Sequence, residues 1–151
     1  MTWFYRNVMA KGFTLVEFLT TFGILALLLT VAAASLRAAG PTLATRAAAR
    51  TLAADLRYAS ELASSTQTAH ALRLNPAGSA YALVRLADPE IIIKNARINE
   101  TVRLGEITVP EATVVFNTLG ATATPGIITL IHASGTTMLI NVRPSGYVRI
   151  E

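Results

Sequence analysis

A carboxylate at the edge of an apolar run is the residue of this chain with the clearest chemical potential. Glu17 directly precedes residues 18–36, a run of 19 positions without a charged side chain. An ionisable group within a membrane helix costs roughly 2.5–3.5 kcal/mol on insertion scales, so it is a functional-site candidate by default. An apolar helix offers the Glu17 carboxylate no basic partner. The alternative is that Glu17 only marks the membrane interface.

A second group of candidates lies at the end of the chain. Arg143 and Arg149 flank a turn at residues 144–146. Strand alternation predicts that both arginines and Tyr147 lie on one face of a hairpin, opposite its apolar residues. Guanidinium groups contact phosphates and an aromatic ring can stack on a base, so these three residues form a candidate nucleic-acid site. Glu151 adds a nearby negative charge, and the alternative is a solvated strand face.

Other chemistry is not indicated. The chain has no cysteine, which excludes disulfides, thiolate metal sites and cysteine nucleophiles. Its two histidines, His70 and His132, fall in separate predicted strands without a metal-ligand spacing. The sequence contains no nucleophile elbow, P-loop or dinucleotide fingerprint. We therefore expect a protein that is not an enzyme, with no cofactor and no metal.

The composition indicates a chain that is partly membrane-associated. Hydrophobic residues make up 52% of the 151 positions and charged residues 15%, against about 25% in a typical soluble domain. The formal net charge is +4, a mild excess that fits phosphate contacts or an ordinary solvated surface. The length suits one domain with an appendage.

The apolar run at residues 18–36 is long enough to span a membrane. As a helix it would extend about 28 Å, close to the roughly 30 Å of bilayer hydrocarbon. Arg6 and Lys11 precede it, which favours a cytoplasmic N-terminus and places the rest of the chain on the far side. One interpretation is a secretory signal peptide, cleaved after the small residues 32–34 to release a domain that starts at Ser35.

The residues before the run support another interpretation. Lys11-Gly12-Phe13-Thr14-Leu15-Val16-Glu17 resembles the class III signal of type IV prepilins and type II secretion pseudopilins. The resemblance implies that a prepilin peptidase removes residues 1–12 after Gly12. It also implies that the new amine on Phe13 is methylated and that the apolar helix is kept. Glu17 would then pair with the α-amine of a neighbouring subunit and support filament assembly.

This resemblance predicts three parts of the chain: a leader at 1–12, a transmembrane helix at 13–41, and a periplasmic or extracellular domain at 42–151. Helical spacing continues to about Ser65, with a bend or local unwinding expected at Gly40-Pro41 and Thr42 as a candidate N-cap. Its expected apolar face is made by Leu43, Ala47, Leu52, Leu56, Ala59 and Ala63. Another face carries Arg46, Arg50 and Arg57, the last able to pair with Glu61.

From His70 onward, short runs of strand-forming residues alternate with turn signals. A long N-terminal helix followed by such a meander predicts an α+β, pilin-like fold, with the spine helix packed on a C-terminal antiparallel β-sheet. The chain also resembles GspH/FimT-type pseudopilins. The segments that carry this likeness are Leu56-Arg57-Tyr58-Ala59, Val114-Val115-Phe116-Asn117-Thr118-Leu119-Gly120 and Gly146-Tyr147-Val148-Arg149.

Three functions follow as expectations. The first is a minor pilin or pseudopilin, a structural subunit of a type IV pilus or a related filament. The resemblance implies that such a subunit can also act as a DNA receptor in natural transformation, through an arginine-bearing C-terminal end. The second is a minor pseudopilin of a type II secretion system that exports folded proteins. Both imply a single-pass inner-membrane protein that enters a cell-surface pilus or a periplasmic pseudopilus with other pilins. The third is a secreted binding domain with a conventional signal peptide.

Overall fold

The computed structural model describes residues 12–151. Its one α-helix, α1 (Leu15–Thr66), contains both the apolar run and the amphipathic stretch expected after it. The helix continues through Gly40 and Pro41, so it does not unwind there and the N-cap expected at Thr42 is wrong. Just after the proline, the Thr45 hydroxyl donates a 2.8 Å hydrogen bond to the carbonyl oxygen of Pro41, four residues earlier in the same helix.

Internal contacts divide the chain into two units, with the boundary between Ala38 and Ala39. In the described part of the first unit, no residue is buried. By length and composition, α1 is the one helix among the described residues that could cross a membrane, and none of its apolar window is buried. The apolar side chains of this segment contact one another in places, as Phe18 and Phe22 do, but none is buried by the rest of the described chain.

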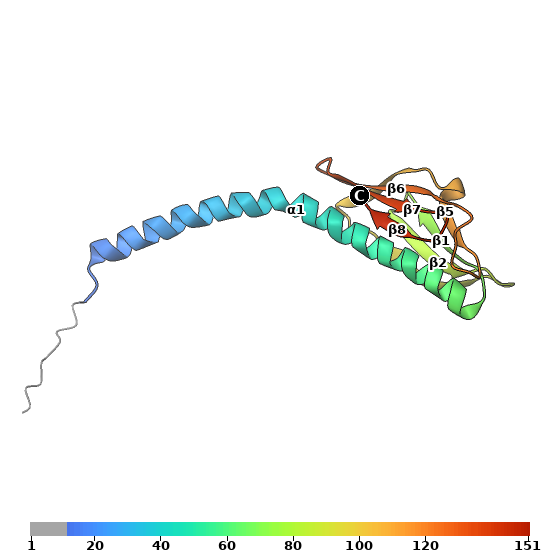
Figure 1. The fold of residues 1–151 in the computed structure, drawn as a ribbon. Helices are drawn as coiled ribbons and strands as arrows, with labels where there is room; N and C mark the ends of the chain where they lie inside the picture. The colour runs from blue at the N-terminus through green and yellow to red at the C-terminus, as the bar shows by residue number, and fades with distance from the viewer. Residues whose placement is uncertain (1–11) are drawn as a thin grey trace, which may run out of the picture. The chain divides into compact units, whose positions relative to one another are not determined.

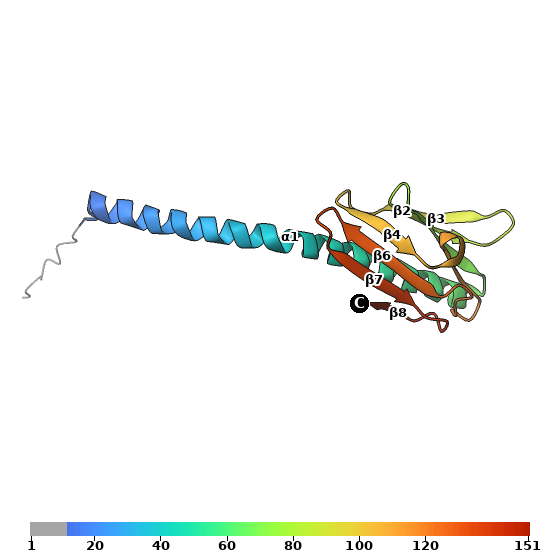
Figure 2. The ribbon, with the colours of Figure 1, turned by 90° about the horizontal axis from the view of Figure 1, so that it is seen from above.

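The second unit, residues 39–151, combines the C-terminal part of α1 with eight strands (Figures 1 and 2). The strands are β1 (His70–Asn75), β2 (Ala80–Arg85), β3 (Ile91–Arg97), β4 (Val102–Ile107), β5 (Thr113–Phe116), β6 (Gly126–His132), β7 (Thr137–Val142) and β8 (Val148–Ile150). A single 3₁₀ turn, η1 (Pro110–Ala112), precedes β5.

The strands form two four-stranded sheets, in the orders β3-β2-β1-β5 and β4-β6-β7-β8. Every strand pairing is antiparallel, which confirms the helix-on-antiparallel-sheet fold class. The expectation of one meander-like sheet is wrong, because β4 pairs in the second sheet and β5 returns to pair with β1 in the first. Only the hairpins β1–β2–β3 and β6–β7–β8 follow chain order.

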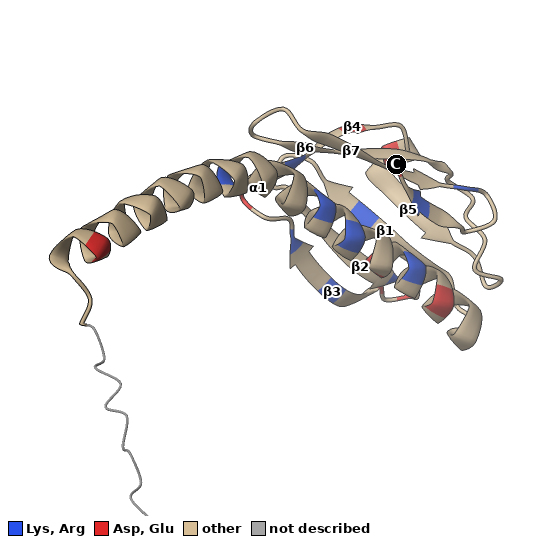
Figure 3. Cartoon of the chain, turned by 60° about the vertical axis from the view of Figure 1, so that its left-hand side comes forward, with Lys and Arg blue, Asp and Glu red and all other residues tan. Residues whose placement is uncertain are grey.

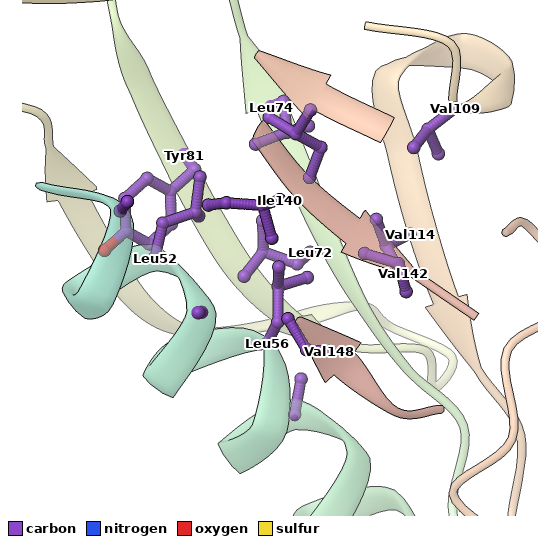
Figure 4. Close-up of a cluster of buried hydrophobic side chains, with 14 of the residues drawn as sticks. Leu52, Leu56, Leu72, Leu74, Tyr81, Val109, Val114, Ile140, Val142 and Val148 are labelled. Atoms are coloured by element: carbon purple, nitrogen blue, oxygen red, sulfur yellow. The ribbon is translucent and has the colours of Figure 1, made fainter. Parts of the chain in front are cut away.

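One core lies between α1 and the two sheets (Figure 4). Leu52 and Leu56 are fully buried from the helix, as the helical spacing predicts. They pack with residues of both sheets, including Leu72, Ile140 and Val148. The buried side chains thus tie the two sheets and the helix into one unit.

The N-terminal end of this buried helix face differs from the expectation. Leu43 is 61% exposed and Ala47 is also exposed. Thr45 and Ala49 take their places, both fully buried. The steps from 45 to 49, 52, 56, 59 and 63 alternate between four and three residues, which keeps a 3.6-residue stripe on one face. The buried stripe therefore starts at a polar residue, Thr45, and the larger apolar side chain of Leu43 lies outside it.

A buried polar contact fixes the helix on the first sheet. Asp55 of α1 is 8% exposed and accepts a 2.6 Å hydrogen bond from the Tyr81 hydroxyl of β2. Lys94 of β3 pairs with the same carboxylate at 2.8 Å. Burial raises the pKa of Tyr81, and the hydrogen bond and charge of Asp55 raise it further. Tyr81 therefore stays protonated at neutral pH and remains a donor to Asp55.

Candidate functional site

The residues of the expected cleavage and assembly site lie at the start of the described chain. Gly12 and Phe13 are exposed and precede the first helical residue, Leu15. Phe13 is 83% exposed, and an added Cβ at Gly12 would meet no other atom within 4 Å. The described residues from Phe13 onward thus leave the bond between Gly12 and Phe13 exposed. The rest of the expected leader lies outside the described residues.

Glu17 lies in the first turn of α1, and its backbone N–H has a local hydrogen-bond partner. Its backbone N–H donates a 3.2 Å hydrogen bond to the hydroxyl of Thr14. Thr14 therefore caps the helix, and Thr14-x-x-Glu17 has the spacing of a capping box. A carboxylate in the first turn also lies at the positive end of the helix dipole. The pattern was readable from the sequence as an N-cap signal.

Large apolar side chains surround this acid and extend along the helix. Leu19, Phe22, Leu29 and Val31 are each more than half exposed. An exposed apolar surface of this extent marks a membrane or protein interface. Glu17 is therefore a carboxylate at the end of a helix segment that must be covered by lipid or by other chains.

The structure brings together the three residues of the candidate nucleic-acid site. Arg143, Tyr147 and Arg149 are exposed, whereas Val142 and Val148 are buried, as alternation predicts. The Arg143 guanidinium lies over the Tyr147 ring, 5.7 Å from its centroid. Its backbone N–H donates a 2.9 Å hydrogen bond to the Tyr147 carbonyl, which closes the turn between them.

Two contacts limit what this hairpin offers to a phosphate. Arg149 Nε lies 3.6 Å from the Glu151 carboxylate, which offsets part of its positive charge. Tyr147 already has Arg143 on its ring and would have to exchange that contact for a base. The site therefore provides one guanidinium without an acidic partner among the described residues, and a second that shares its charge with Glu151.

The C-terminal turn is held against the helix by a close approach between the backbones of two glycines, which no sequence pattern predicted. Gly120 and Gly146 both have positive φ, at 77° and 80°. A Cβ at Gly146 would overlap the carbonyl oxygen of Gly120, and that oxygen accepts a 2.7 Å hydrogen bond from Ser60 of α1. The Thr122 N–H also bonds the Pro144 carbonyl at 3.0 Å. Two of the segments that carry the family resemblance, 114–120 and 146–149, thus contact each other and fix the hairpin.

Arg57 helps to hold the C-terminal hairpin on α1, so it is not part of an open arginine face. Its Nη2 donates a 2.8 Å hydrogen bond to the carbonyl of Val148 in β8. The structure gives Arg57 this partner in place of the expected pair with Glu61. Figure 3 shows further basic positions along the part of α1 that packs on the sheets. Arg46 and Arg50 are exposed there and form the rest of the arginine face.

The histidines stay apart, as expected. His70 lies in β1 of one sheet and bonds the Thr68 carbonyl at 2.7 Å, while His132 lies in β6 of the other and contacts Ser134. Within residues 12–151, no three histidine, aspartate or glutamate side chains gather in a way that could hold a metal ion.

A spine helix packed on antiparallel sheets, with an apolar N-terminal segment, is the fold of pilins and pseudopilins. The family described as "Type II transport protein GspH" matches residues 48–146, more than half of the chain. The chain therefore belongs to the GspH family of pilin-like proteins. No curated protein sequence gives a significant match.

Solved structures show the same fold at low identity. The type IV minor pilin FimU of Pseudomonas aeruginosa superposes with a TM-score of 0.58 at 18% identity, covering 71% of this chain and 87% of FimU. The minor pseudopilin EpsH from the type 2 secretion system of Vibrio cholerae gives a TM-score of 0.60 at 13% identity, covering 71% of this chain and 95% of EpsH. One neighbour is a pilus subunit and the other a secretion subunit, so the likeness does not separate the two systems.

Proposed function

We propose that this chain is a minor, non-catalytic subunit of a type IV pilus or a related filament, inserted through the N-terminal part of α1. The observation that carries the proposal is the wholly unburied apolar segment of α1, with Glu17 at its end. The core of residues 39–151 is complete without this segment. The segment therefore serves first as a membrane anchor and then as the part that packs against other subunits.

Processing follows the class III pattern in this proposal. A prepilin peptidase cleaves the exposed Gly12–Phe13 bond, and the amine of Phe13 is methylated. The chain has a leader at 1–12, a membrane helix at 13–41 and a pilin-like domain at 42–151. The exposure of the bond and the non-helical backbone of residues 12–14 support access by a peptidase.

Glu17 is the assembly residue in this account. Its carboxylate pairs with the Phe13 amine of a neighbouring subunit, which removes an unpaired charge from an apolar surrounding. The inner membrane holds the subunit before assembly, with residues 42–151 in the periplasm. Other pilins or pseudopilins are then its partners, at the cell surface or in a periplasmic pseudopilus.

Filament isolation tests the proposal. We expect the epitope-tagged chain to co-purify with sheared surface filaments, or with pseudopili when the major pseudopilin is overproduced. Which fraction contains it distinguishes the pilus from the secretion system. Recovery of the chain only as a soluble protein in the periplasm or medium would contradict the filament role and support a conventional signal peptide.

A second function, DNA capture during natural transformation, rests on the hairpin of Arg143, Tyr147 and Arg149. The shared exposed face of these residues and the fixation of their turn support it. A filament that presents several such subunits would be needed, because two phosphate contacts give only weak, salt-sensitive binding.

Removing both arginines should abolish most of this binding. We expect the full chain in detergent micelles to shift duplex DNA in a gel at low salt. In the double variant Arg143→Ala plus Arg149→Ala, affinity should fall at least about tenfold, and the salt slope should decrease by about two because each phosphate contact contributes about 0.9. Arg103→Ala, on an exposed position of β4, is the matched control.

Circular dichroism must show the same fold for all variants. Undiminished binding in the double variant would move the site to Arg46 and Arg50 on α1. Absence of a shift at every salt concentration would leave the structural role alone.

A further inference from the structure

The outer face of the first sheet carries an open cavity of about 500 Å³ over β2. We call it the β2 trough and define it by six residues: Arg73, Asn75, Ala80, Ala82, Asn95 and Arg97. Their outward position follows from strand alternation, since Leu72, Leu74, Tyr81 and Leu83 lie on the opposite face in the core. The trough is thus separate from the hairpin of β7 and β8 and from the apolar part of α1.

Strand register explains the shape of the trough. Ala82 of β2 lies between Arg73 of β1 and Asn95 of β3. One pleat further along, Ala80 lies between Asn75 and Arg97. Two methyl groups therefore form the floor, and each alanine has an arginine on one side and an asparagine on the other. A floor of this kind runs along the strand direction and suits an extended ligand.

The charges of the two walls differ. Arg73 holds Glu90 in a two-point contact, with nitrogen–oxygen distances of 2.7 and 2.8 Å. Glu90 does not itself line the cavity, but it occupies the Arg73 guanidinium at the rim. Arg97 has no ion-pair partner within residues 12–151, although it is exposed on the other wall. The trough thus offers one open guanidinium beside one that is already neutralised.

The two asparagines add groups that match a peptide backbone. Asn75 Oδ1 accepts a 3.2 Å hydrogen bond from Gly78 N–H, which leaves its Nδ2 group to donate. The side chain of Asn95 is exposed and lines the cavity from the other wall. A side-chain amide both donates and accepts, so it can pair with the C=O and N–H groups of an extended chain.

We propose that the β2 trough binds an extended peptide segment of another protein, through a carboxylate that pairs with Arg97. The volume falls within the roughly 300–1,000 Å³ range of ligand sites. Guanidinium groups bind carboxylates in a planar, two-point geometry. Nucleic acid fits less well, because Glu90 at the rim repels phosphates and only one guanidinium is open. The proposal does not depend on membrane insertion or filament assembly.

A peptide array tests this proposal. The full chain in detergent micelles is applied to acetylated pentapeptides with a fixed central glutamate and varied flanking residues, and to the same array with central glutamine. We expect preferential retention on the glutamate array. Arg97→Gln should reduce that retention at least about tenfold, and Ala82→Leu should do the same by filling the floor. Arg103→Gln, an exposed strand arginine of the other sheet, should have no effect.

Thermal unfolding should be the same for all variants, since each replaced residue lies on an outer face. Equal retention on the two arrays, or retention unchanged by Arg97→Gln, would overturn the proposal. Displacement of bound glutamate peptides by a short DNA duplex, with stronger retention of the duplex, would instead assign the trough to nucleic acid.

Discussion

Replacing Gly12 by leucine is expected to leave the chain in the inner membrane at its precursor length. Gly12 has no Cβ, and its bond to Phe13 lies in an exposed segment before the helix. A leucine side chain would occupy the space in which a peptidase must approach the backbone. Immunoblots of membrane fractions should show nearly complete loss of the faster-migrating, processed form.

Gly23→Leu provides the matched control for this variant. Gly23 lies inside the apolar part of α1, and an added Cβ there meets no other atom within 4 Å. The same substitution should therefore allow normal processing and membrane insertion. Processing of Gly12→Leu at the wild-type rate would contradict the prepilin assignment.

Replacing Glu17 by valine is expected to spare membrane insertion and cleavage but to reduce incorporation into filaments. Insertion should be at least as efficient, because a charge has been removed from the edge of an apolar helix. A hydrogen bond to a charged group contributes about 1.5–3 kcal/mol, so incorporation should fall roughly ten- to hundredfold. The ratio of this subunit to the major subunit in isolated filaments measures the effect.

Glu17→Gln separates the charge from the helix cap. Glutamine keeps the hydrogen-bonding capacity of a capping box with Thr14 but cannot form an ion pair with an amine. Both variants should be poorly incorporated if the carboxylate pairs with Phe13 of a neighbour. Normal incorporation of the glutamine variant would show that Glu17 acts only within its own helix. Thr20→Val, three residues further along, should assemble normally.

The sequence predicted the elements whose signals are local. The uncharged run before Arg37 and the helical spacing of Leu52 and Leu56 were sufficient to expect one long helix packed on strands. Alternation around the turn at 144–146 also predicted which residues of the last hairpin are exposed. Such periodic patterns depend on neighbouring residues only, so they can be read without knowledge of the fold.

Features that depend on distant pairings could not be predicted. The division into two sheets requires β5 to pair with β1, about forty positions earlier, and no local pattern specifies that partner. The contact of Gly146 with Gly120 and Ser60 joins three segments, although the glycines themselves were visible as turn signals. The β2 trough also appears only when the register aligns Ala80 with Asn75 and Arg97.

Mass spectrometry of the mature N-terminus tests the central claim most directly. The chain is purified from the membrane and from isolated filaments, and its N-terminal peptide is sequenced. The account predicts a chain that begins at N-methylated Phe13 and retains the apolar helix with Glu17. A mature chain that begins at Ser35, without the apolar segment, would contradict it.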